Sequence, residues 1–350
     1  MNTKVENLAL SQFTAFDQET KLEFCPGINV FIGKNSTGKS HAMKAIYSIL
    51  KVCEQAQRDE IDLNREKIRD RLYEKFRGVF RPDKVGRLVR HGVSRKGGSV
   101  SLTYNSNHIE ISITSLDNLS ASYDKLLSPE PSVFLPAHEF LSAYQGFVAA
   151  YQNRELAFDE TYYDLSVALS ATPLRGPRQD EIKSLVEPLQ KAIWGAKITQ
   201  QGGKFYVRLP EANLEAPLVS EGYRKFAGLI YLLINGSLTQ NGVLFWDEPE
   251  ANLNPKMVTT LVDVLEILAK SGMQIFISTH DYLLSQELSL KAEYLGDDMR
   301  FFGFSQPKRG AGVIVESGRS LVEISENPII EEFAAHYDRE ENLSFRRRDV

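Results

Sequence analysis

Eight residues near the N-terminus, Gly33–Ser40, combine two glycines, two lysines and four hydroxyl or amide side chains in the order GKNSTGKS. They follow the mostly apolar run Ile28–Ile32 and precede a stretch with helical spacing at 40–51. The pattern G-x-x-x-x-G-K-[ST] between a strand and a helix is typical of a loop that binds nucleotide phosphates. Glycines let backbone N–H groups turn toward the phosphates, and the N-terminus of the next helix attracts the same anion.

Within this loop, Lys39 is expected to reach the β- and γ-phosphates, and the Ser40 hydroxyl to ligate Mg²⁺. The sequence therefore predicts binding of ATP and Mg²⁺. Since no motif reads the base, GTP stays an alternative. The residues predicted to bind the nucleotide are Gly33, Lys34, Asn35, Ser36, Thr37, Gly38, Lys39, Ser40 and His41.

Two carboxylates, Asp247 and Glu248, follow a second apolar run, Val243–Trp246. Open parallel sheets bind ligands at the carboxyl ends of their strands, so we expect these carboxylates near the phosphate loop. Asp247 is predicted to bind Mg²⁺ together with Ser40, and Glu248 to polarise the attacking water. Many strands end in an acid, and the pair becomes informative because a phosphate-binding loop lies upstream.

A histidine, His280, follows the next predicted strand, Gln274–Ser278. A single histidine after a strand is often structural. Its place directly after the strand that follows the carboxylate pair favours a role in sensing the γ-phosphate. Glu248 and His280 are therefore the predicted catalytic residues.

The segments that must position these residues alternate between strand and helix, which predicts an α/β fold with a mainly parallel sheet covered on both faces. Helical spacing also dominates residues 54–77 and 138–195. Two hairpins are expected, one around Asn105–Asn107 and one around Gly202–Gly203. The predicted strands are Ala9–Phe16, Lys21–Phe24, Ile28–Ile32, Val133–Leu135, Val243–Trp246, Gln274–Ser278 and Met299–Phe304, and the predicted helices after Val243 are Pro255–Lys270 and Tyr282–Leu290.

Composition narrows the class of protein further. The chain has 350 residues, 42% of them hydrophobic and 25% charged, with a formal net charge of −5. Cys25 and Cys53 are the only cysteines, which favours a reducing compartment over a disulfide framework. The N-terminus lacks the apolar segment of a signal peptide, and Phe226–Ile234 is too short to span a bilayer. We predict a cytoplasmic protein that does not contact membranes.

Together these motifs resemble the ABC-type ATPases. In this resemblance Gly33–Ser40 is Walker A, Val243–Glu248 is Walker B, and His280 is the switch histidine. The segment after Glu250 is similar to the D-loop, with Asn252 and Asn254 as its site residues. The resemblance implies an ATP-hydrolysing P-loop head, dependent on Mg²⁺, that forms a homodimer or a higher homo-oligomer around ATP.

The segment Val219–Lys225 (VSEGYRK) occupies the place of the ABC signature motif. It is similar to the diverged signatures of SMC, RecF and OLD-like ATPases and departs from the transporter consensus LSGGQ. The resemblance implies a trans signature of Ser220, Glu221 and Gly222, in which Ser220 and Gly222 contact the γ-phosphate held by the opposite subunit. Alternatively, Ser220 is a helix N-cap, and the two roles are compatible.

The Q-loop expected after Val133–Leu135 is less regular, because no glutamine follows that strand. His138 and Glu139 are candidate substitutes, and Gln145 lies further along a predicted helix. A transporter subunit fits poorly for the same reason, since this loop and the signature both depart from the transporter pattern.

The resemblance is strongest over residues 1–50 and 215–305. The middle of the chain, including LPAHEFLSAYQGF and FDETYYDL, resembles prokaryotic AAA-15/AAA-21 ATPases, several of which act in anti-phage systems. We therefore expect an ATPase core with an antiparallel β subdomain and an inserted helical lobe. The predicted units are a core at 1–50 and 196–320, a basic helical arm at 51–98, a hairpin and Q-loop strand at 99–137, a helical lobe at 138–195, and a tail at 321–350.

One segment, Asn64–Lys96, holds twelve Lys and Arg residues against four acids. Such a patch is able to follow the phosphate backbone of DNA or RNA. The alternative is a solvated helix whose charges pair internally at i,i+3 spacing, such as Glu66 with Arg69. The charge pattern does not decide between them.

Two functions remain open at this point. The first is an ATPase that dimerises around ATP and gates a separately encoded effector, a nuclease or toxin, in a prokaryotic anti-phage complex. The second is an SMC/RecF-like DNA-binding ATPase of DNA repair or maintenance. The basic segment supports the second, whereas the absence of a long heptad region argues against a complete SMC protein.

Overall fold

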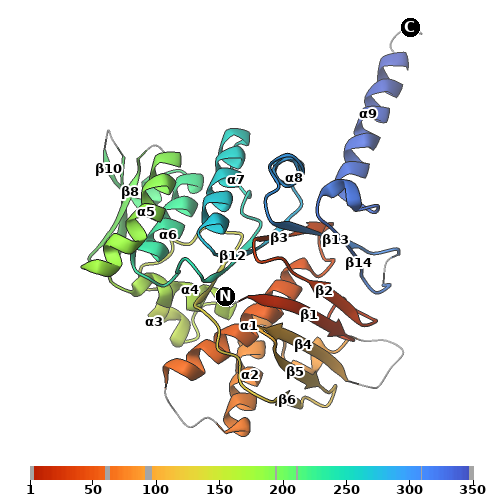
Figure 1. Ribbon diagram of the computed structural model, residues 1–350, viewed down its shortest axis with the longest axis horizontal. Coiled ribbons are helices and arrows are strands. Elements are labelled where there is room, and N and C mark those ends of the chain that lie inside the picture. The colour runs from red at the N-terminus through yellow and green to blue at the C-terminus, as the bar shows by residue number, and fades with distance from the viewer. Residues whose placement is uncertain are drawn as a thin grey trace.

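The computed structural model describes residues 4–59, 64–90, 97–193, 195–209, 212–308 and 310–346. In this part of the chain the strands form a mainly parallel sheet, an antiparallel sheet and a small sheet. Figure 1 shows the mainly parallel sheet at the centre, with the antiparallel sheet below it and helices on the other side.

The mainly parallel sheet has the order β14-β13-β3-β12-β11-β7. Neighbours in it run parallel except β13 and β14, which confirms the predicted fold class. Pairing places Asp247 beside Ser278, and Thr279 beside Ile32, so the ends of three strands meet at one edge. The bounds are β3 Ile28–Gly33, β7 Ser132–Leu135, β11 Val243–Asp247, β12 Gln274–Thr279, β13 Met299–Ser305 and β14 Ile314–Gly318.

This sheet is buried on both faces, as its continuous apolar strands predicted. In β3 the side chains alternate, so that Val30 and Ile32 join one core and Phe31 the other. The Val30 side is covered by α6 (Glu221–Ile234), α7 (Pro255–Lys270) and α8 (Tyr282–Leu295).

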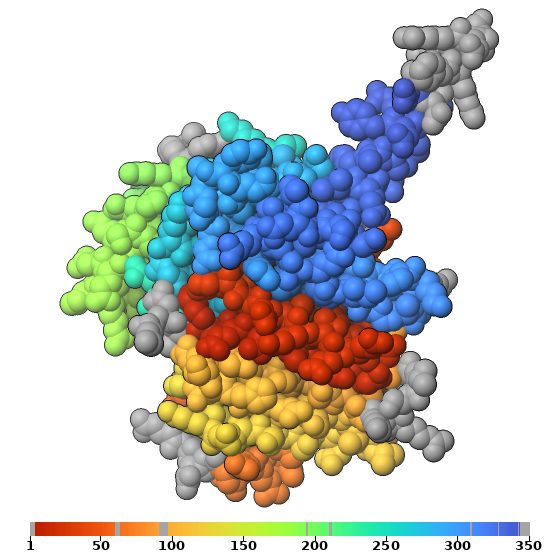
Figure 2. Space-filling model, turned by 45° about the vertical axis from the view of Figure 1, so that its right-hand side comes forward, coloured from red at the N-terminus to blue at the C-terminus, as the bar shows by residue number. Residues whose placement is uncertain are grey.

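On the Phe31 side lie the helix α1 (Lys39–Arg58) and the antiparallel sheet, ordered β2-β1-β4-β5-β6. Ile46 of α1 shares a core with Val100 and Phe276, which belong to the two different sheets. Figure 2 shows the N-terminal strands as a band between the two layers. The bounds are β1 Val5–Ser11, β2 Thr20–Glu23, β4 Gly98–Tyr104, β5 Asn107–Ile113 and β6 Leu119–Tyr123.

A helical lobe and the small sheet flank α6 (Figure 1). The small sheet, ordered β10-β9-β8, contains the second predicted hairpin, and β4 with β5 forms the first. The bounds are α2 Arg65–Phe80, α3 Phe147–Gln152, α4 Glu160–Ser170, α5 Pro177–Ala192, β8 Lys197–Gln201, β9 Lys204–Arg208 and β10 Asn213–Glu215, with 3-10 turns at Val85–Leu88, Ala216–Leu218 and Leu321–Glu323.

Several expected bounds differ from the structure. The strand predicted at Ala9–Phe16 ends at Ser11, because Phe13 and Phe16 exchange backbone hydrogen bonds in a tight turn that buries both rings. Helix α1 continues through the expected boundary at residue 50 to Arg58, since its apolar face stays buried as far as Ala56. The division of the chain into five units thus remains a proposal.

The helix α9 (Pro328–Arg346) was not expected from the sequence. It projects from the body of the protein, as both overall views show (Figures 1 and 2). Its N-terminal end is anchored by the buried Ile329 and by Phe333, whose ring stacks on Tyr282 with 4.1 Å between centroids.

Candidate nucleotide-binding site

The loop Gly33–Ser40 closes around its own lysine. Lys39 Nζ donates to the carbonyl oxygens of Gly33 at 2.7 Å and Lys34 at 2.9 Å, and the side chain is 5% exposed. Gly38 has φ of 91°, a left-handed conformation that glycine adopts without strain. Burial lowers the pKa of the Lys39 ammonium, and the nearby Glu248 opposes this shift.

A cavity of about 340 Å³ opens on this loop. Of the predicted nucleotide-binding residues, it brings together those from Asn35 to His41, while Gly33 and Lys34 support the loop through their carbonyls. Glu248 also lines the cavity, as does Ala15, which sequence reasoning missed. Ala15 comes from the turn after β1, where its methyl group would lie 3.1 Å from a Cβ on Gly38.

Ser40 and Asp247 form a pair of hard oxygen donors at the edge of the sheet. Ser40 Oγ donates to Asp247 Oδ1 at 2.9 Å, and Ser278 Oγ donates to the same oxygen. Hydroxyl and carboxylate oxygens are ligands that suit Mg²⁺. The oxygens of Ser40 and Asp247, the predicted metal ligands, therefore suit Mg²⁺. Ser278 is an additional residue, which orients the Asp247 carboxylate.

Glu248 and His280 are in contact. His280 Nδ1 lies 3.2 Å from Glu248 Oε1, and both side chains are partly exposed, at 49% and 31%. Glu248 has φ of 45°, unusual for a residue other than glycine, and its N–H donates to Ser278 O at 3.0 Å. The turn after β11 thus aims the Glu248 carboxylate toward the cavity and the histidine.

The residues after Glu248 form the turn predicted as the D-loop. Asn252 has φ of 62°, and its side chain donates to Glu221 at 3.0 Å. Asn254 caps α7, because its Oδ1 accepts from Met257 N at 3.0 Å. The buried Glu250 accepts from Thr279 Oγ1, and burial raises the pKa of its carboxyl group.

The signature segment begins α6, with Ser220 at the N-cap position. Ser220 is exposed and its side chain makes no capping hydrogen bond, so its hydroxyl is available to a ligand. Gly222 is buried, and an added Cβ would lie 2.6 Å from Met257 and 2.9 Å from Leu253. A side chain at this position would therefore collide with the D-loop turn and with α7.

The segment after β7 contacts α6. Glu139, a candidate substitute for the Q-loop glutamine, has its Oε1 2.8 Å from Arg224 Nε, and its side chain is 6% exposed. Arg224 also donates to the carbonyl of Val219, directly before Ser220. The structure thus pairs Glu139 with the signature helix, and it does not place Glu139 in the cavity lined by Lys39.

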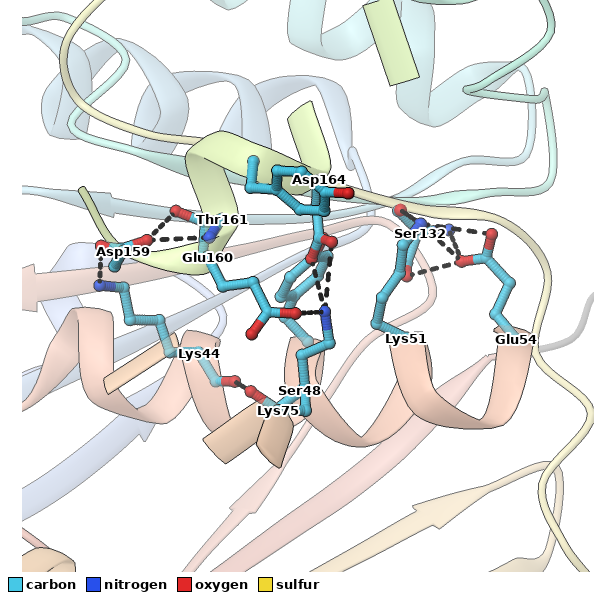
Figure 3. A network of polar contacts seen from close by, with 12 residues as sticks. Lys44, Ser48, Lys51, Glu54, Lys75, Ser132, Asp159, Glu160, Thr161 and Asp164 are labelled. Atoms are coloured by element: carbon cyan, nitrogen blue, oxygen red, sulfur yellow. Dashed lines mark hydrogen bonds and ion pairs between the residues drawn. The ribbon is translucent and has the colours of Figure 1, made fainter. Parts of the chain in front are cut away.

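A network of charges holds the Walker A helix α1 against its neighbours (Figure 3). Lys75 of α2 lies between Glu160 and Asp164 of α4, at 2.5 and 3.0 Å. Tyr47 of α1 donates to Asp164 at 2.7 Å, and Lys44 pairs with Asp159 at 2.8 Å. The acidic run in FDETYYDL therefore neutralises internal lysines.

We expect Lys75→Met to lower the free energy of unfolding by about 3–5 kcal/mol, because it leaves the buried Asp164 and the partly buried Glu160 without their cation. Burial would lower the pKa of Lys75, but Asp164 and Glu160 outweigh it and raise that pKa. Burial raises the pKa of Glu160, and Lys75 opposes that shift. Urea unfolding of both proteins at several pH values measures the cost.

The pH dependence of this cost has a defined sign. Without Lys75, the folded-state pKa of Glu160 rises further above its unfolded value, so the folded variant binds more protons and loses stability as pH rises. The cost should be smaller at pH 5 than at pH 8. Lys44→Met, which breaks a partly exposed pair, should cost about 1 kcal/mol or less. Equal costs for both variants would contradict the role of Lys75.

The basic segment Asn64–Lys96 is partly neutralised within the fold, although 91–96 lie outside the described residues. Of the predicted i,i+3 pairs, the described part shows Glu66–Arg69 at 3.5 Å. Others pair with distant acids, as Arg71 does with Asp59 at 2.7 Å. Five basic residues of the range 64–90 have no acid of the described residues within 4 Å, namely Arg65, Lys67, Arg77, Arg81 and Lys84.

Searching the described residues for a membrane-crossing helix, we found none that is both long enough and apolar enough. This agrees with the short apolar runs seen in the sequence.

Comparison with known families identifies the domain. The profile of the AAA_21 family, described as "AAA domain, putative AbiEii toxin, Type IV TA system", matches residues 28–285. That range covers more than two thirds of the chain and contains the site from Gly33 to His280.

Curated relatives match over shorter stretches. The chain is 39% identical over 62 residues to a "Putative ABC transporter ATP-binding protein" of Methanosarcina acetivorans. It is 32% identical over 95 residues to the arginine transport ATP-binding protein ArtP of Haemophilus influenzae. The matches span 22% and 32% of the length of these relatives, and 18% and 27% of this chain.

Solved structures share the fold over most of the chain. The Smc head domain of Pyrococcus furiosus, solved with the C-terminal domain of ScpA, has a TM-score of 0.56 at 12% identity and covers 95% of this chain and 100% of its own. The SMC head domain of Thermotoga maritima has a TM-score of 0.50 at 13% identity and covers 89% and 98%. The chain therefore belongs to the AAA_21 family, and it shares its fold with the SMC head domains.

Proposed function

We propose that this chain binds and hydrolyses ATP with Mg²⁺ as a homodimer, and that closure of the dimer gates a separately encoded nuclease or toxin in a prokaryotic anti-phage complex in the cytoplasm. The observation that carries the proposal is the cavity at the sheet edge, where Walker A residues and Glu248 meet. The family description names a putative toxin and a toxin–antitoxin system, which supports a role in such systems.

In the proposed reaction, Lys39 binds the β- and γ-phosphates, and Ser40 and Asp247 would hold Mg²⁺, which would neutralise phosphate charge. Glu248 accepts a proton from the attacking water, since its carboxylate lines the cavity. His280 contacts Glu248, and we assign it the response to the γ-phosphate. We assign Ser220 to the ATP of the opposite subunit, because its exposed hydroxyl lies at the N-terminus of α6.

The assignment of Ser220 predicts the behaviour of Ser220→Arg. The larger, charged side chain should block closure, so that ATP-dependent dimerisation is lost while the monomer binds ATP within about threefold of the original affinity. Light scattering with and without ATP, together with nucleotide titration, measures both. Ser184→Arg on the exposed face of α5 is the control. Loss of ATP binding by the Ser220 variant would contradict a trans role.

The alternative function is an SMC/RecF-like DNA-binding ATPase. The likeness to the Smc head supports it, as do the positive charges of Lys67 and Arg77 on α2 and of Lys84 after it, which have no acid within 4 Å in the described residues. Internal pairing of Arg71 and Lys75 leaves less free charge than the sequence suggests.

One experiment separates the two functions. Glu248→Gln protein is isolated from its native host with ATP and Mg²⁺, either with or without nuclease treatment, and bound proteins and nucleic acids are identified. A stoichiometric protein partner that survives nuclease supports the effector, and its direct binding to the purified chain must depend on ATP. Recovery of DNA or RNA alone, lost on treatment, supports the alternative.

A further inference from the structure

Arg90 is a largely buried arginine whose guanidinium group joins two loops. Its Nη1 donates to the carbonyl oxygens of Ala15 at 2.9 Å and Thr14 at 3.3 Å, and its Nη2 donates to that of Gly310 at 2.8 Å. The side chain is 14% exposed, and its Nε lies 3.9 Å from an oxygen of Asp17. The positive charge of Arg90 is therefore directed mainly at backbone carbonyls, from the turn after β1 and from the loop between β13 and β14.

The turn after β1 has a backbone that needs such support. Gln12 has φ of 49° and Thr14 has φ of 46°, which are left-handed conformations at residues other than glycine. Such a backbone persists only where its surroundings fix it. The buried rings of Phe13 and Phe16 hold the turn from inside the core, and Arg90 holds its other side through charge-assisted hydrogen bonds.

The loop between β13 and β14 supports the same turn by two further contacts. Val313 N donates to the carbonyl oxygen of Ala15 at 3.1 Å, so this oxygen accepts from both Val313 and Arg90. Gly312 packs so closely on Asp17 that an added Cβ would not fit. The position of Ala15 therefore depends on how this loop and Arg90 hold the turn.

The turn forms one wall of the cavity at the phosphate loop, where Ala15 presents a methyl group. The other described residues that line this cavity carry polar side chains, apart from Gly38. Phosphates are bound by hydrogen-bond donors and cations, which a methyl group does not offer. An apolar wall instead suits the nucleoside part of a nucleotide.

We propose that Arg90 is a positioning residue for nucleotide binding. By joining the turn after β1 to the loop between β13 and β14, it holds Ala15 where its methyl group packs on the nucleoside of bound ATP. The inference rests on the proposed function, in which ATP binds in this cavity. Arg90 does not itself line the cavity, so it acts through Ala15 and not by contact with the phosphates.

The test is Arg90→Met, which keeps a long side chain and removes the guanidinium group. The affinity for a non-hydrolysable ATP analogue with Mg²⁺ should fall about 10-fold or more, because one lost methylene contact in a pocket changes binding by about 10- to 200-fold. The affinity for inorganic tripolyphosphate, which has no nucleoside, should stay within about threefold. Isothermal titration of both ligands measures the difference.

Steady-state kinetics give a second measure of the same contact. The KM for ATP should rise by the same factor as the dissociation constant of the analogue, while kcat stays within about threefold. This split is expected because a contact with the nucleoside is equally strong in the ground state and in the transition state. A general loosening of the fold would instead weaken tripolyphosphate binding and lower kcat as well.

Arg300→Met is the matched control, with the same residue type and the same substitution. Arg300 is partly buried near the start of β13, away from the loop of Gly310, and its guanidinium group donates to the Ser317 hydroxyl at 3.0 Å. It lies outside the cavity. The affinities of this variant for both ligands should match those of the original protein, even if its melting temperature falls.

The outcomes separate the inference from the proposed function. If the unmodified protein binds neither the ATP analogue nor tripolyphosphate, the proposed function fails. If it binds the analogue, but Arg90→Met keeps the original affinity or weakens both ligands by the same factor, only the role of Arg90 is wrong. Should Arg90→Met not fold, Arg90→Lys replaces it. One ammonium group does not reproduce the guanidinium fork, so a selective loss of about threefold in analogue affinity is expected, and an unchanged affinity would overturn the inference.

Discussion

A Glu248→Gln variant is expected to lose at least about 100-fold of its ATP turnover, because a positioned general base contributes about 10²- to 10⁴-fold to such a reaction. Glutamine keeps the size of the side chain and an oxygen for the contact with His280, but it cannot take the proton of water. ATP should remain bound, and the dimer should accumulate in its closed form. Steady-state phosphate release and size-exclusion chromatography with ATP and Mg²⁺ measure the two effects.

The control is Glu23→Gln on β2, where the exposed carboxylate pairs with Lys21 and lies outside the cavity. It should hydrolyse ATP at the original rate. Turnover by Glu248→Gln within about threefold of the original would show that another group activates the water. In that case His280, the partner of Glu248, is the next residue to replace.

A Lys39→Ala variant is expected to lose ATP affinity by about 100-fold or more. The ammonium group donates to two carbonyls of its own loop, and in the proposed function it donates to phosphate oxygens. A hydrogen bond to a charged group contributes about 1.5–3 kcal/mol, so the loss of two of them accounts for at least this change. Isothermal titration with a non-hydrolysable ATP analogue and Mg²⁺ measures it.

Lys183→Ala on α5, a charge with 66% of its side chain exposed, is the control for the lost positive charge. Its affinity should match that of the original protein. Retained tight binding by Lys39→Ala would mean that the backbone N–H groups and the helix N-terminus hold the phosphates without the lysine. Melting temperatures of both variants distinguish lost binding from lost folding.

The sequence by itself determined the elements that obey local rules. Asn254 and Pro255 mark the start of α7, and Ser271 with Gly272 mark its end, so its predicted range matches the structure. The mainly parallel sheet followed from buried runs alternating with helices, and the profile match and the Smc likeness confirm that fold class. Walker A could be predicted from the sequence because its residues are consecutive in the chain. A few neighbouring residues are enough to set the backbone conformation that binds phosphates.

The pairing of distant strands, and the residues that line the cavity beside the phosphate loop, were decided only by the tertiary structure. The antiparallel sheet joins β1 to β4 across some ninety residues, and no local pattern specifies that partner. Ala15 enters the cavity only because the turn after β1 packs against Gly38. Distances of this kind are set by the shared core of α1 and both sheets, which depends on the whole chain.

The same contrast holds for charged residues, whose partners only the tertiary structure shows. The sequence counts Lys75 as one of twelve positive groups in Asn64–Lys96, yet the fold places it between two carboxylates of α4. In Lys225 the sequence shows one more polar residue of a helix, whereas the structure shows a buried cation on the turn of Glu248. A residue type states what a group is able to bind, but burial and the partner brought by tertiary packing decide what it does bind.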